Sequence, residues 1–78
     1  MKGGLYQGTI MLRIRAERLK RGWSQIVLAY HSGVANSDIS AIECGHLRPY
    51  PSQLARLASA LEIKDPDLLL QEVREGAA

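Results

Sequence analysis

Residues 25–44 constrain the fold of this chain more than any other stretch, and they read QIVLAYHSGVANSDISAIEC. Apolar residues recur there at helical spacing on both sides of a chain reversal: Leu28, Ala29, Ile39 and Ile42. Between the two patterns, Gly33 can adopt the positive φ that a sharp reversal requires. Ser24 stands where the hydroxyl of an N-cap residue can accept a free backbone N–H. The stretch therefore predicts two short helices joined by a tight turn.

The spacing of these residues carries a further constraint. Two helices that meet at roughly 90–120° across a short turn bring their backbones close together. A small side chain is needed at the crossing, and Ala29 provides it. The combined pattern resembles the helix-turn-helix of the phage-repressor and Cro family, and it comprises Gln25, Leu28, Ala29, Gly33, Val34, Ile39, Ile42, Glu43 and Gly45. The resemblance extends over about residues 10–70 and includes the run LARLASAL at 54–61.

The resemblance implies a role on DNA for individual residues of the motif. Four of them match positions that face base edges in the major groove: Asn36, Ser37, Ser40 and Ala41. Four others match positions that approach the DNA backbone: Ser24, Gln25, Cys44 and Arg48. Arg18 and Glu43 match a structural ion pair that holds the second helix of the motif against the first helix of the domain. Asn36 has a competing interpretation as a helix cap, because Ala35 has no capping side chain.

The rest of the chain predicts an all-α, five-helix domain without strands, and the resemblance implies that it is of the lambda-repressor type. The helices beyond the motif are expected at about 10–21, 51–61 and 65–75. In the first of them, Ile10, Met11 and Ile14 should face the core, with Leu19 doing so in part. Residues 1–9, which carry three glycines, are expected to be a flexible arm, residues 10–75 the DNA-binding domain and residues 76–78 a tail.

A leucine-rich surface near the C-terminus predicts a homodimer. Its residues are Leu68, Leu69, Leu70 and Val73. This set is broader than one core-facing helix needs, and a two-fold pair of recognition helices would read a palindromic site on double-stranded DNA. Ile26 and Val27 stand where the family usually has polar residues, so they are expected to be exposed, covered by the arm or by a partner protein.

Composition and charge agree with a small DNA-binding domain. The 78 residues leave room for one domain, and the single cysteine suits a reducing cytoplasm. We expect no membrane-spanning segment, since no apolar run approaches about 18 residues. Residues 1–48 hold seven Lys or Arg and three acids, whereas residues 49–78 hold three and five. A basic front and an acidic back suit a protein that docks one end on a polyanion.

Catalysis and metal binding find little support in the sequence. His31 and His46 are fifteen residues apart and have no further ligands at metal spacing. Cys44 has no adjacent base, although a redox-sensing role stays open. We therefore expect no enzyme activity, no metal and no cofactor.

Three functions remain. The first is a sequence-specific DNA-binding transcriptional regulator, specifically a repressor that acts as a cytoplasmic homodimer. The second is the antitoxin of a toxin–antitoxin pair, and the third is a protein-interaction adaptor that retains the fold without reading DNA.

Overall fold

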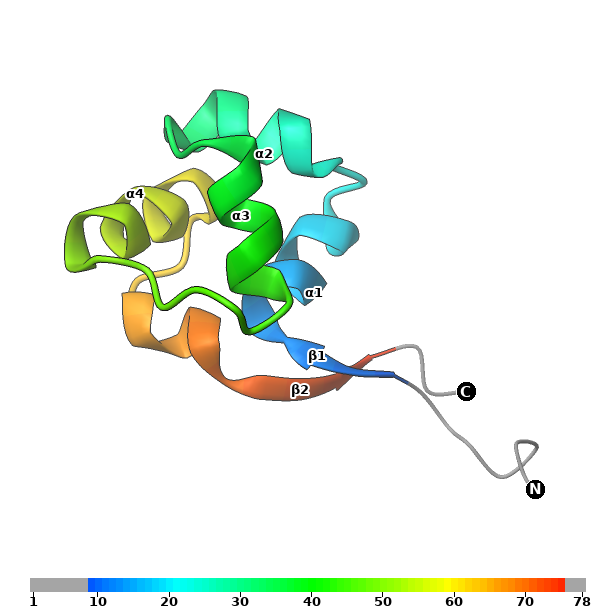
Figure 1. Ribbon diagram of the computed structural model, residues 1–78. Helices are drawn as coiled ribbons and strands as arrows, with labels where there is room; N and C mark the ends of the chain where they lie inside the picture. The colour runs from blue at the N-terminus through cyan, green and yellow to red at the C-terminus, as the bar shows by residue number, and fades with distance from the viewer. Residues whose placement is uncertain (1–8, 76–78) are drawn as a thin grey trace, which may run out of the picture.

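The computed structural model describes residues 9–75, which form a mostly helical domain around a helix-turn-helix (Figure 1). In chain order the elements are β1 (Thr9–Leu12), α1 (Arg13–Lys20), α2 (Gln25–Ser32), α3 (Asn36–Glu43), α4 (Pro51–Leu61), the 3-10 helix η2 (Pro66–Leu70) and β2 (Glu72–Glu75). None of the helices within residues 9–75 has the length and apolar character that crossing a bilayer requires.

The turn between α2 and α3 is built from local signals. The Ser24 hydroxyl accepts the backbone N–H of Val27 at 3.1 Å and caps the start of α2. Gly33 ends α2 with φ of +74°, a left-handed conformation that disfavours residues with a Cβ. The Ser32 hydroxyl then accepts the N–H of Val34 at 3.1 Å. These bonds fix the reversal that the sequence predicted.

The core lies where the four α-helices and η2 meet. Seven side chains in it are fully buried, namely Ile14, Leu28, Ile39, Ile42, Leu57, Leu61 and Leu69. Burying an aliphatic side chain of this size stabilises a fold by about 1.5–3 kcal/mol relative to leaving it exposed. Because Ile39 and Ile42 are both at 0% exposure, they hold α3 down by one face and leave its other face free.

The two ends of the described chain differ from the prediction. Residues 9–12 were expected partly in an arm and partly in the first helix, and residues 71–75 in a fifth helix. Instead β1 and β2 pair antiparallel with Thr9 opposite Glu75 and Leu12 opposite Glu72. The expectation of a strandless, five-helix domain was therefore wrong in detail, although the mostly helical class is confirmed.

Packing explains both corrections. The predicted fifth helix shrinks to the single 3-10 segment η2, which is enough to insert Leu69 into the core. After η2 the chain continues as β2, which runs alongside residues 9–12. Thr9 and Ile10 in that segment are β-branched and favour a strand. Ile10 and Leu19 were expected in the core, but they are 54% and 46% exposed. The rest of the predicted arm, residues 1–8, and the tail at 76–78 lie outside the described residues.

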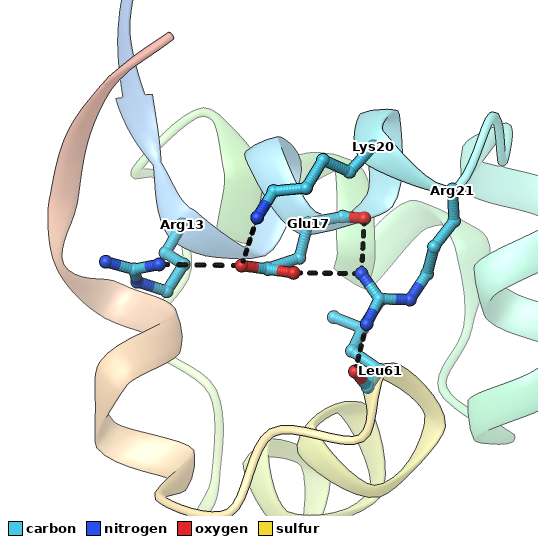
Figure 2. A network of polar contacts seen from close by, with 5 residues as sticks. All are labelled: Arg13, Glu17, Lys20, Arg21 and Leu61. Atoms are coloured by element: carbon cyan, nitrogen blue, oxygen red, sulfur yellow. Dashed lines mark hydrogen bonds and ion pairs between the residues drawn. The ribbon is translucent and has the colours of Figure 1, made fainter.

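The nearly buried carboxylate of Glu17 binds side chains from both ends of α1, and one of them, Arg21, also contacts α4. Glu17 accepts hydrogen bonds from Arg21 at 2.9 Å, from Lys20 at 3.3 Å and from Arg13 at 3.4 Å (Figure 2). Arg21 also donates to the backbone carbonyl of Leu61 at the C-terminus of α4. Such a bond satisfies a carbonyl that has no partner inside its own helix.

These contacts shift the ionisation of Glu17. Burial by itself raises the pKa of this carboxyl group, but hydrogen bonds and positive charge from Arg21 and Lys20 outweigh burial, so its pKa falls below the ordinary value of 4.5. A folded-state pKa below the unfolded one means that the unfolded chain binds the proton more tightly. The resulting stability is present above about pH 4.5 and is lost as the pH falls through the folded-state pKa.

We therefore expect Glu17→Gln to unfold more easily than the parent at neutral pH and to lose less stability on acidification. Urea unfolding between about pH 7 and about pH 2 measures both effects. Glu62→Gln replaces an exposed glutamate and is the matched control. Its free energy of unfolding should change with pH as the parent's does. Parallel pH curves for the parent and Glu17→Gln would contradict the assignment.

Candidate nucleic-acid interface

α3 presents one free face of short side chains. Asn36 and Ser37 are exposed at its N-terminal end, Ser40 and Ala41 are half-buried along its length, and Cys44 is exposed at its C-cap. The structure thus brings all four predicted base-reading residues to one helix, with Cys44 on the same element. Side chains this short let a helix backbone approach a ligand surface closely.

Asn36 is the first residue of α3, and the N-cap position belongs to Ala35. The methyl group of Ala35 cannot accept a hydrogen bond, so the backbone N–H groups of the first turn depend on other acceptors. Asp38 lies in the same turn, where its negative charge stabilises the positive end of the helix dipole. The exposed amide of Asn36 therefore sits at the entry to the free face and outside the N-cap position.

The orientation of α3 is fixed by a bidentate ion pair with α1. Arg18 donates from Nε to Glu43 Oε2 at 2.8 Å and from Nη2 to Glu43 Oε1 at 2.9 Å. The side chains of Arg18 and Glu43 are only 9% and 3% exposed. Bidentate geometry fixes direction as well as distance, and burial strengthens the pair because little water screens it.

Two further residues complete this network. Arg18 Nη1 donates to the backbone carbonyl of Trp23 at 2.8 Å, and Gln25 Nε2 donates to Glu43 Oε1 at 3.1 Å. The network therefore joins α1, the α1–α2 loop, α2 and α3. Gln25 was expected to contact DNA phosphate, yet its amide group is bound inside the protein. A phosphate contact there would use the second amide N–H of Gln25 or its backbone N–H.

Gln53 is a positioning residue that the sequence analysis missed. Its Nε2 donates to Asp38 at 3.0 Å, and its Oε1 accepts the backbone N–H of Tyr50 at 3.0 Å. The same amide therefore ties the start of α4 to the first turn of α3. A polar residue at the third position of a helix, as Gln53 is in α4, is a capping signal that could have identified it.

The remaining residues predicted at the DNA backbone lie at both ends of the motif. The Ser24 oxygen caps α2, and its hydroxyl hydrogen can donate to a phosphate. Gly45 closes α3 with φ of +79°, and the N–H of His46 returns to the carbonyl of Ala41 at 2.8 Å. This closure leads the chain into the loop that carries Arg48, whose side chain is exposed.

The outer side of α2 carries apolar and aromatic groups. Ile26 and Tyr30, four residues apart, are 67% and 83% exposed, whereas Val27 is half-buried. The imidazole of His31 stacks on Trp23 with ring centroids 4.5 Å apart. Trp23 thus packs against the core on one side and His31 on the other. The expectation of a partner protein at Ile26 and Val27 stays a prediction.

The predicted dimer surface is split by the structure. Leu69 is fully buried in the core of its own chain, so it is not available to a second copy and this part of the prediction was wrong. Leu68, Leu70 and Val73 are half-buried. Within residues 9–75, no group of three or more His, Cys, Asp or Glu side chains is arranged to hold a metal ion.

A helix-turn-helix whose second helix is anchored by one face and free on the other defines a class of DNA-binding transcription regulators. The helix-turn-helix domain family matches residues 12–71 of this chain. The chain belongs to this family, and its resemblance to the phage-repressor and Cro type is confirmed.

A solved structure gives a second comparison. The restriction-modification controller protein C.AhdI from Aeromonas hydrophila shares 34% sequence identity with this chain, with a TM-score of 0.68. The match covers 74% of this chain and 86% of that chain. A comparison with curated protein sequences finds no match.

The ion pair generates a stability prediction. Glu43→Ala leaves a buried arginine without its partner, and we expect it to lower the free energy of unfolding by about 3–5 kcal/mol. Replacing both groups by apolar side chains, Arg18→Met with Glu43→Leu, should cost much less than the sum of the single changes. Urea unfolding of the parent, of Glu43→Ala, of the single variants Arg18→Met and Glu43→Leu, and of the double variant measures both effects. A Glu43→Ala protein as stable as the parent would show that the pair contributes nothing.

Proposed function

We propose that the chain is a sequence-specific DNA-binding repressor that reads the major groove with α3 and acts as a homodimer on a palindromic operator. The observation that carries the proposal is the free face of α3, held in place by the buried Arg18–Glu43 pair. The similarity to a restriction-modification controller protein supports a regulatory role over that of an antitoxin or an adaptor.

The size of the α3 face suits a groove. The major groove of B-DNA is about 12 Å wide, and a helix with its side chains is about 10–12 Å across. Serine and alanine on the outward face keep α3 at the narrow end of that range. Long charged side chains, common on ordinary surface helices, would hold the backbone away from the bases.

Each residue on that face has a distinct capacity for reading bases. The amide of Asn36 donates and accepts at once, which matches the N6 and N7 atoms of adenine. Ser37 and Ser40 can donate to or accept from either kind of base. The methyl group of Ala41 offers only an apolar contact, which suits the methyl group of thymine.

Contacts to the phosphates would flank this face. Ser24 and Gln25 lie at the start of α2, where free N–H groups and the helix dipole favour an anion. Arg48 lies in the loop after the C-terminal end of α3 and would contribute a full positive charge. Contacts of this kind orient the protein without discriminating between sequences.

Asn36 and Arg48 should therefore respond differently to substitution. We expect Asn36→Ala to lose about 1–3 kcal/mol of discrimination at one position of each half-site and to keep non-specific affinity. We expect Arg48→Ala to weaken binding to all duplexes and to flatten the log–log salt dependence by about one unit per protomer. Operator duplexes selected from a random pool, titrated at several salt concentrations, give both quantities.

The controls separate reading from folding. Arg56→Ala removes an exposed arginine from the middle of α4 and should leave both binding terms unchanged. If Asn36→Ala lowers affinity for every duplex equally, or lowers only the melting temperature, Asn36 is a structural residue. If the parent selects no duplex at any salt concentration, the proposed function is wrong.

A further inference from the structure

Along the two-stranded sheet, the backbone N–H and C=O groups of successive residues point alternately toward and away from the neighbouring strand. This alternation determines which residues of β2 have free backbone groups at the outer edge of the sheet. The N–H of Arg13 donates to the carbonyl of Gln71 at 2.8 Å, just beyond the register of β1 and β2. Hydrogen-bonded and non-hydrogen-bonded pairs alternate along an antiparallel ladder. Met11 opposite Val73 is therefore a hydrogen-bonded pair, and the backbone groups of Val73 point toward β1.

The backbone groups of the neighbouring residues point the other way. By the same alternation, the N–H and C=O groups of Glu72 and Arg74 face the outer edge of β2. Within residues 9–75 the sheet has only two strands, and Figure 1 shows β2 on the side of β1 that faces away from α3. An unpaired edge of this kind is a template for another strand.

The sequence of this edge is complementary to itself. A two-fold axis through Val73 places Glu72 opposite Arg74 of the partner subunit, and the same contact recurs on the other side of the axis. Opposite charges that face each other across antiparallel strands stabilise the pairing. The parity also matches, because Glu72 and Arg74 are the residues whose backbone groups face outward.

Other registers are disfavoured by charge. Parity allows a shift of the partner only in steps of two residues. One such shift places Glu72 opposite Glu72 of the partner subunit, and the opposite shift places Arg74 opposite Arg74 of the partner subunit. Like charges directly opposite each other are destabilising. Of these three registers, only the one centred on Val73 avoids both repulsions and forms both attractions.

The edge of β1 is a weaker candidate for the same role. Its residues 9–12 carry no charge that could select a register. Met11 and Leu12 also line a hollow together with Cys44 and Gly45, which places the C-terminal end of α3 beside this strand. A second strand would meet α3 on that side.

We propose that a second copy of this chain pairs with β2 edge to edge, antiparallel and centred on Val73, and so completes a four-stranded sheet across the two-fold axis. The inference rests on the homodimer of the proposed function and names the surface that forms it. Four backbone hydrogen bonds and two Glu72–Arg74 ion pairs across the subunits hold the strands together. Val73 meets its own copy at the centre, in a non-hydrogen-bonded pair where side chains lie closest.

Charge reversal tests the register directly. Glu72→Arg and Arg74→Glu each turn both attractions into repulsions, and each should raise the dimer dissociation constant about tenfold or more. An equimolar mixture of the two variants restores both attractions, so it should form heterodimers about as tightly as the parent forms homodimers. The double variant, Glu72→Arg with Arg74→Glu, should likewise recover homodimers.

Sedimentation equilibrium over a wide range of concentrations, with and without operator duplex, measures each state. Both substituted residues are exposed, so circular dichroism and thermal melting should match the parent. Arg56→Glu reverses an exposed charge on α4 and is the matched control, expected to leave the dissociation constant unchanged.

The outcomes separate this interface from the proposed function. Dimers that resist both reversals, or a mixture that fails to recover, overturn the edge-to-edge pairing. A chain that is monomeric at every concentration, free and on a duplex it selects, also overturns the pairing but leaves DNA reading intact. Recovery in the mixture supports the pairing even if no duplex is selected, in which case only the proposed function fails.

Discussion

The bidentate contact between Arg18 and Glu43 is the interaction on which the rest of the domain depends. It joins α1 to α3 through two residues that are 25 positions apart in sequence, and its members also bond Trp23 and Gln25. The hydrophobic effect is non-directional, so burial of apolar surface does not by itself specify the angle between two helices. A buried fork of two charged hydrogen bonds permits one orientation, so it sets the angle at which α3 leaves the domain.

The helix-turn-helix could be predicted because its signals are local. Ser24, Gly33 and the spacing of Leu28, Ile39 and Ile42 each specify conformation within a few residues. Family resemblance added the pairing of Arg18 with Glu43, which no local pattern contains. The residues of the free α3 face could also be identified from a local signal, because helical spacing decides which side chains share a face.

The sheet was missed because its information is distributed over the whole chain. β1 and β2 are short, and neither has an alternating pattern strong enough to indicate a strand. Each becomes a strand only when the other lies beside it, and η2 must first place Leu69 in the core. The bond from Gln25 to Glu43 and the role of Gln53 were missed for a related reason: the sequence does not indicate which buried partner a side-chain amide will bond.

Pairing the first and last described residues also makes the domain a nearly closed ring. Thr9 faces Glu75 across the sheet, so the ladder spans almost the entire described sequence. Closing a loop this long costs entropy that grows as about (3/2)RT ln n, and the short ladder offers few bonds in return. The helices can therefore assemble before Thr9 and Glu75 meet. We expect the two-stranded sheet of β1 and β2 to be the part of the fold that forms last and opens first. The chain therefore leaves the described domain at Thr9 and at Glu75 from the same corner, and tension applied through either residue would act first on this two-stranded sheet.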